Sequence, residues 1–230
     1  MSPEDYVRSK TTMAMSSIDK FQQMVEKDYH HQYKHNMLQV NNGNGTYSDI
    51  SQMAGVASTD WSWSVLFADF DLDGYNDAFV TNGVFRDVID QDNQFNTWVK
   101  EQPTFSNAAA YADLDNDGDL DIVVNNINEA ATLLKNNAIE TNKGQFIQFE
   151  FKGSKNNESG VGVKVDLMLD DGKILSRELV NARGYLSSVS NKLHFGLGEK
   201  KMIPKVRISW IDGKTQELFY VKSNQLLKVS

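Results

Sequence analysis

One nine-residue pattern of aspartates occurs twice in this chain of 230 residues. The pattern is D-x-D-x-D-G-x-x-D, and its copies occupy residues 69–77 and 113–121, each between short apolar runs. Alternate side chains of an extended segment face the same way, so the aspartates at positions 1, 3 and 5 point into one concavity. Glycine at position 6 permits a sharp turn that lets the backbone carbonyl of position 7 join them. The aspartate at position 9 closes the ring from the start of the next strand.

Such an all-oxygen, anionic cage suits a hard cation of the size of Ca²⁺. We therefore predict two calcium sites on a β scaffold. The predicted ligands are Asp69, Asp71, Asp73, Tyr75 and Asp77 in the first loop and Asp113, Asp115, Asp117, Asp119 and Asp121 in the second. Position 7, which is Tyr75 or Asp119, is expected to contribute its backbone carbonyl.

The loops also allow two other interpretations. Aspartate and glycine are ordinary turn formers, so a single loop of this kind is also typical of a solvated acidic turn. Two copies in the same strand context favour calcium loops. An EF-hand is a weaker alternative, because its loop needs a glutamate at position 12 and flanking helices. Position 12 is Val80 or Val124 here, inside a predicted strand.

Charge is distributed unevenly along the chain, whose net charge is −8. Residues 1–143 hold 22 Asp and Glu against 9 Lys and Arg, whereas residues 144–230 hold 9 acidic and 14 basic residues. Bound calcium would neutralise much of the N-terminal excess, so the acidity is interpreted as metal ligands, and no nucleic-acid partner is expected. The change from acidic to basic composition near Gly144 predicts a domain boundary there. Together with the motifs, it divides the chain into three predicted parts: a helical N-terminal segment at 1–35, calcium-binding repeats at 36–143 and a β-sandwich at 144–230.

Other features exclude some classes of protein. No apolar run approaches the roughly 18 residues of a membrane span, and no N-terminal signal peptide is visible. The chain has no cysteine, which excludes a disulfide scaffold and thiol chemistry. No Ser-His-Asp or H-E-x-x-H pattern is present, so the chain is not expected to be an enzyme.

The N-terminal part predicts one helix and one hairpin. Ser17 is a plausible N-cap for a helix at 18–27, whose apolar stripe either packs on its own domain or binds a partner. Asn-Gly pairs within 41–46 predict a hairpin between strands at 37–40 and 46–50. His30, His31 and His35 suggest zinc, but no third ligand of conventional spacing follows, so we favour surface or packing histidines.

The repeat region has a spacing of 44 residues from Asp69 to Asp113, which is typical of a propeller blade. Trp61 and Trp63 share one strand face, where they either pack in the interior or stack on sugar rings. Residues 84–103 carry no hairpin signal and are predicted to form a loop and a short helix. A further strand is predicted within 130–137.

The C-terminal part alternates apolar and polar residues in a run of short segments. This pattern predicts an antiparallel β-sandwich able to fold alone. The predicted strands are 146–151, 160–169, 174–180, 192–195, 205–210 and 218–221, with hairpin turns at 170–173 and 211–214.

Two sets of motifs resemble known families. The loops within F-A-D-F-D-L-D-G and Y-A-D-L-D-N-D-G resemble FG-GAP/VCBS repeats, the blades of integrin-α-type β-propellers. The motifs G-Y-L-S-S at 184–188, L-H-F-G-L-G at 193–198 and V-R-I-S-W at 206–210 resemble the ASPIC/UnbV domain, which follows such repeats in many bacterial surface proteins. The resemblance implies a mostly β chain: partial propeller-like FG-GAP/VCBS repeats, then an antiparallel sandwich, with a short N-terminal helix.

The same resemblance implies where the protein works and what it binds. It implies an extracellular protein, or one at the bacterial outer surface or periplasm, with calcium-binding repeats and a role in adhesion or in binding a protein or glycan ligand. For bacterial relatives it implies an accessory of glycan uptake. A full propeller needs more blades than two, so we expect the chain to be part of a longer protein. Two alternatives stay open: a polysaccharide-acting enzyme on a calcium-bound scaffold, and a purely structural spacer.

Overall fold

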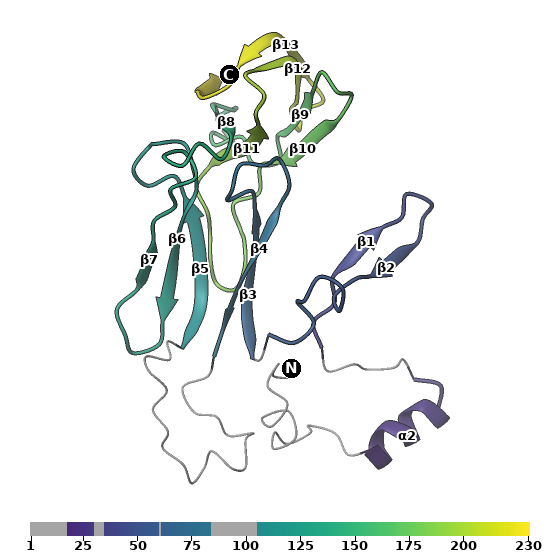
Figure 1. The fold of residues 1–230 in the computed structure, drawn as a ribbon. Helices are drawn as coiled ribbons and strands as arrows, with labels where there is room; N and C mark the ends of the chain where they lie inside the picture. Colours follow the sequence, from purple (N-terminus) through teal and green to yellow (C-terminus); the bar gives the residue numbers. More distant parts are fainter. Residues whose placement is uncertain (1–17, 30–34, 60, 84–104) are drawn as a thin grey trace. The chain divides into compact units, whose positions relative to one another are not determined.

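The computed structural model describes residues 18–29, 35–59, 61–83 and 105–230, and these are mostly β-strand with one short helix (Figure 1). The mostly β fold predicted from the sequence is therefore confirmed. The chain divides into two compact units. The first comprises residues 1–63, 80–107 and 126–129, and the second comprises 64–79, 108–125 and 130–230. Both aspartate loops and the whole C-terminal sandwich belong to the second unit.

The first unit contains the predicted helix and hairpin. Helix α2 spans Ile18–Glu26, and strands β1 (Gln39–Asn41) and β2 (Tyr47–Asp49) pair antiparallel with Val40 opposite Ser48. The connecting turn closes where the Asn42 N–H donates to the Thr46 carbonyl over 3.0 Å. The predictions made for Ser17, His30, His31 and residues 84–103 lie outside the described residues.

The repeat strands form two small sheets. Strands β3 (Ser62–Ala68) and β4 (Asp77–Asn82) make one, and β5 (Ser106–Ala112), β6 (Asp121–Asn126) and β7 (Thr132–Leu134) make the other. The apolar runs beside each aspartate loop thus form the predicted strands. Within the second unit their inward residues make a small core: Leu66, Ala109, Ile122 and Val124, with Phe70, Phe79 and Tyr111 packed against it.

The C-terminal part is a sandwich of two sheets, as predicted. One sheet has the order β10-β9-β12-β13, and the other has the order β11-β8-β14. The strands are β8 (Gln145–Phe151), β9 (Lys164–Met168), β10 (Ile174–Glu178), β11 (Lys192–Gly198), β12 (Met202–Ser209), β13 (Thr215–Lys222) and β14 (Leu226–Val229). Alternate residues face inward and form a core that includes Phe149, Phe195, Val165 and Ile208, all fully buried. Burial of such side chains is the main source of stability in a domain of this kind.

Two details of the sandwich differ from the sequence prediction. Strand β14 was not predicted, and it pairs parallel to β8, with Leu227 opposite Phe149. The strand predicted at 160–169 begins only at Lys164, because Gly160 and Gly162 adopt positive φ values of 68° and 85° that a strand does not allow. The turns at 170–173 and 211–214 close antiparallel hairpins as predicted.

Candidate metal centres

Each aspartate loop connects two antiparallel strands and has the same backbone. In the following, loop 1 is Asp69–Asp77 and loop 2 is Asp113–Asp121. Position 4 is left-handed in both, at Leu72 (φ 65°) and Asn116 (φ 62°), and so is the glycine at position 6, with φ 89° in loop 1 and 110° in loop 2. Two left-handed residues within three positions curl the chain, which turns the carboxylates inward.

The position-9 aspartates brace the loops in the same way. The backbone N–H of Phe70 donates to Asp77 over 2.9 Å, and the backbone N–H of Leu114 donates to Asp121 over 3.0 Å. In loop 2 the N–H of Asn136 also donates to Asp121, over 2.9 Å. These bonds tie the end of each loop to its second residue, so the shared sequence pattern produces a shared local structure.

Loop 1 gathers part of its predicted ligand set. Carboxylate oxygens of Asp69, Asp71 and Asp77 lie within 4.8 Å of one another. Asp73 does not belong to this group, and it accepts a hydrogen bond from the Tyr75 N–H over 2.7 Å. The Tyr75 side chain is exposed, and the Lys173 ammonium lies 3.5 Å from the centre of its ring.

Loop 2 gathers two overlapping groups of carboxylates. Asp113, Asp115 and Asp117 form one, and Asp117, Asp119 and Glu140 form the other, each with oxygens within 4.8 Å of one another. Glu140 was missed by the sequence analysis, because it lies beyond β7 and outside the aspartate pattern. The turn that carries it is fixed to the loop, since the Ile139 N–H donates to Asp119 over 3.0 Å.

Several of the loop carboxylates are buried, which leaves oxygens without hydrogen-bond partners and raises pKa values. One oxygen each of Asp69, Asp113, Asp117 and Asp119 is buried without a hydrogen-bond partner in the part of the chain that the structure describes. Burial raises the pKa of Asp69 to about 6 and that of Asp117 to about 6, and it also raises the pKa of Asp119. Unpaired buried carboxylate oxygens are costly, and a bound cation would satisfy them. The acidic groups are therefore able to hold a metal ion.

One lysine already lies beside loop 2. The Lys135 ammonium is 2.7 Å from Asp115 and 3.2 Å from Glu140. This hydrogen bond and charge hold the pKa of Asp115 below its usual value. The corresponding neighbour of loop 1 is Arg177, whose guanidinium lies 3.9 Å from Asp69.

Side chains of the sandwich support loop 2. The Gln148 amide on β8 donates to Asp113 over 2.7 Å, and the His194 Nε2–H on β11 donates to the Gly118 carbonyl over 2.8 Å. His194 is buried and stacks on Phe146, with ring centroids 6.1 Å apart. Burial lowers the pKa of His194 to about 4, so the imidazole is neutral at physiological pH.

Glycines permit this close approach. A Cβ on Gly118 would lie 2.0 Å from the Phe146 ring, and one on Gly196 would lie 2.2 Å from an Asp69 carboxylate oxygen. The Gly198 N–H donates to the Leu72 carbonyl over 2.8 Å. The F-G-L-G segment at 195–198 has a register shift between Gly196 and Gly198 and packs on loop 1.

Asn136 joins the two loops to each other. Its side-chain amide donates to the Phe70 carbonyl of loop 1 over 2.6 Å and to the Leu120 carbonyl of loop 2 over 3.3 Å. Nothing in the aspartate pattern indicated this residue, because the contact depends on how the two repeats pack.

The remaining aromatic and histidine candidates lie in the first unit. Trp61 and Trp63 are half-buried with ring centroids 6.3 Å apart, and the Trp63 indole N–H donates to the Gly83 carbonyl over 2.6 Å. His35 lies 3.5 Å from the Asp49 carboxylate. Neither arrangement includes a third metal-ligating side chain among the described residues.

The fold and the paired acidic loops define a β-rich repeat module. Residues 30–80 match the family model for an FG-GAP-like repeat, and residues 153–230 match the model named ASPIC and UnbV. The chain thus carries an FG-GAP-like repeat and an ASPIC/UnbV domain in these two segments, and repeats of this type are typical of extracellular and surface proteins. No curated protein matches the chain. Among the described residues, no helix has both the length and the apolar character needed to span a membrane.

Proposed function

We propose that the chain is an extracellular module that binds calcium in both aspartate loops and recognises a protein or glycan ligand, with a role in adhesion or ligand capture. The observation that carries the calcium part is the set of buried carboxylate oxygens without hydrogen-bond partners at Asp69, Asp113, Asp117 and Asp119. Oxygen ligands of high negative charge suit Ca²⁺ better than softer metals.

In this proposal the residues have distinct roles. Asp69, Asp71 and Asp77 would hold the ion in loop 1. In loop 2 the carboxylates Asp113, Asp115, Asp117 and Asp119 would hold it, with Glu140 as an additional ligand. Because Gln148 and His194 donate to loop 2 from the sandwich, calcium binding would stabilise the packing of the loops on the ASPIC/UnbV domain.

Thermal unfolding with Ca²⁺ and with chelator tests the calcium part. Calcium at about 100 times its dissociation constant adds about 2.7 kcal/mol per site, which corresponds to a rise of about 5 to 10 °C for a chain of this size. Asp71→Ala and Asp115→Ala are suitable variants, since both side chains are exposed and their loss leaves the core intact. Each variant should remove part of the rise.

Asp212→Ala is the matched control, because Asp212 is an exposed aspartate in a hairpin turn outside both loops. It should keep the full calcium response. If the wild-type curves with Ca²⁺ and with chelator coincide, the loops are acidic turns and the calcium part of the proposal fails.

We further propose that the module binds without catalysis. Carboxylates held by a cation stay ionised and make poor general acids, and the loop aspartates are the main concentration of carboxylates in the second unit. Hydrolysis of polysaccharides that persists in Asp71→Ala and Asp115→Ala would contradict this view. A purely structural spacer would show the calcium response but capture no ligand on a glycan or protein array.

A further inference from the structure

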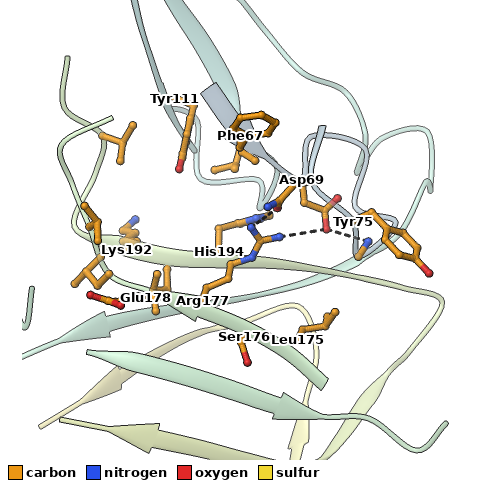
Figure 2. A pocket seen from close by; sticks show the side chains of 18 of the residues that line it. Phe67, Asp69, Tyr75, Tyr111, Leu175, Ser176, Arg177, Glu178, Lys192 and His194 are labelled. Atoms are coloured by element: carbon orange, nitrogen blue, oxygen red, sulfur yellow. Dashed lines mark hydrogen bonds and ion pairs between the residues drawn. The ribbon is translucent and has the colours of Figure 1, made fainter. Parts of the chain in front are cut away.

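The second unit contains a pocket of about 590 Å³ beside loop 1. Its wall is formed by the end of β3, loop 1, strand β10 and the start of β11, as Figure 2 shows. Arg177 faces the pocket from β10, whereas Ser176 and Glu178 alternate with it and lie on the exposed face of that strand. The aspartate pattern did not indicate this pocket, because most of its wall comes from the sandwich.

Cationic side chains outnumber carboxylates in the pocket wall. Lys173, Arg177, Arg183 and Lys192 line it, against Asp69 and Glu178. Arg177 is fixed in place, because its guanidinium lies 3.9 Å from Asp69 and also donates to the Asn76 side chain. Figure 2 shows Arg177 pointing toward Asp69.

Arg183 differs from Arg177 in its partners. The Arg183 Nε is buried and has no hydrogen-bond partner within the described ranges of the chain. A buried guanidinium N–H without a partner is costly. A guanidinium is a planar donor that recognises carboxylates in a fixed, often bidentate geometry. A ligand carboxylate in the pocket would accept hydrogen bonds from the terminal nitrogens of the Arg183 guanidinium, which belongs to the pocket wall.

Aromatic rings line the same pocket. Phe67 has 43% of its surface exposed, and Tyr111 and Tyr75 also belong to the wall. Aromatic faces beside hydrogen-bonding groups suit a sugar ring, which has apolar C–H faces and hydroxyls at its edge.

Calcium in loop 1 would make the pocket more attractive to anions. Asp69 is both a pocket residue and a member of the loop 1 carboxylate group. A bound cation offsets the negative charge of that carboxylate, which leaves the four basic side chains in larger excess. Anion binding and calcium binding are then expected to strengthen each other, since coupling between two sites is reciprocal.

We propose that this pocket binds an acidic sugar, that is, a saccharide unit carrying a carboxylate, with the carboxylate on Arg183 and Arg177 and the ring beside Phe67 and Tyr111. The inference rests on the ligand-binding part of the proposed function and names the class of ligand. It also assigns the recognition to the ASPIC/UnbV domain and loop 1 together.

Calorimetric titration of the full chain with D-glucuronate, D-glucose and inorganic sulfate, in calcium and in chelator, tests the inference. D-Glucuronate should bind saturably and more tightly in calcium, D-glucose should not bind detectably, and sulfate should compete poorly. Arg183→Gln should weaken D-glucuronate binding about tenfold or more, the loss of one hydrogen bond to a charged group. Arg207→Gln, which removes an equal charge from β12 outside the pocket, is the control and should bind as the wild type does.

The unfolding temperature of each variant shows whether it folds, and Lys192→Gln at the pocket wall replaces Arg183→Gln if that variant does not. Absence of D-glucuronate binding, equal binding of sulfate, or binding unchanged in both pocket variants would each overturn the inference. These failures are distinct from failure of the calcium proposal. If calcium raises the unfolding temperature but D-glucuronate does not bind, the calcium proposal stands and the pocket inference fails. If D-glucuronate binds but calcium does not raise the unfolding temperature, the calcium proposal fails and the pocket still binds an acidic sugar.

Discussion

Loop 1 and loop 2 have the same sequence pattern and the same backbone, yet they differ in what surrounds them. Loop 1 gathers three aspartates, and its basic neighbour is the half-buried Arg177 of the sandwich. Loop 2 gathers a larger set of carboxylates that includes Glu140, and its basic neighbour is the exposed Lys135. Position 7 shows the difference directly: Tyr75 is exposed in loop 1, whereas Asp119 is fully buried in loop 2.

This difference indicates that the repeat pattern determines the backbone conformation of a loop, whereas the residues packed around the loop determine its local charge and its function. Loop 2 has more carboxylates and is better suited to hold a cation tightly. Loop 1 shares Asp69 with a basic pocket and is better suited to couple a cation to a ligand. Substitutions at equivalent positions of the two loops can separate these roles.

The position-6 glycines should show the largest contrast. A Cβ on Gly118 would meet the Phe146 ring at 2.0 Å, whereas the nearest atom to a Cβ on Gly74 is 3.5 Å away. Both residues have positive φ, so alanine strains the backbone in either loop by about 1 to 2 kcal/mol. Gly118→Ala adds overpacking, which costs about 1 to 3 kcal/mol more.

Urea denaturation of Gly118→Ala and Gly74→Ala measures this difference in the free energy of unfolding. Gly213→Ala is the control, because Gly213 has φ 86° and open space around it. Gly74→Ala should resemble the control, and Gly118→Ala should be less stable than both. Equal losses in all three would mean that loop 2 does not depend on close packing against β8.

The sequence predicted the local structure well because each part of it is encoded within a few residues. The aspartate spacing and the glycine at position 6 determine the loop backbone, and the apolar runs determine β3 to β6. Residues that contact the loops from distant parts of the sequence have no local sequence pattern that predicts the contact. Asn136 and Glu140 reach the loops from the segment after β7, and Arg177 reaches them from β10. Only the packing of the folded chain brings these residues there. Strand β14 was missed for the same reason, since its pairing with β8 joins segments that are far apart in the chain.

Glu140 should distinguish the two loops in metal affinity. It lies with Asp117 and Asp119 in loop 2 and belongs to no group in loop 1. Glu140→Gln removes one negative ligand, so the calcium affinity of loop 2 should fall about tenfold while that of loop 1 stays unchanged. Calorimetric titration with Ca²⁺ in the Asp71→Ala background isolates loop 2. Glu199→Gln, at an exposed glutamate of the sandwich, should have no effect; an equal loss there would show a general charge effect instead of coordination.

Substitution of Lys135 should have the smallest effect, and it should raise the calcium affinity of loop 2, whereas Glu140→Gln lowers it. Its ammonium is 2.7 Å from Asp115 and carries a positive charge where the proposed cation would bind. Lys135→Gln should raise the calcium affinity of loop 2 about two- to fivefold, the size of an exposed ion-pair energy. Because exposed charges are screened by salt, the gain should shrink at high ionic strength. Lys214→Gln removes a lysine that is equally close to Asp212, at 2.7 Å, and serves as the control. A lower affinity in Lys135→Gln would mean that the lysine positions Asp115 and Glu140 for the ion, and loop 2 would then depend on its basic neighbour.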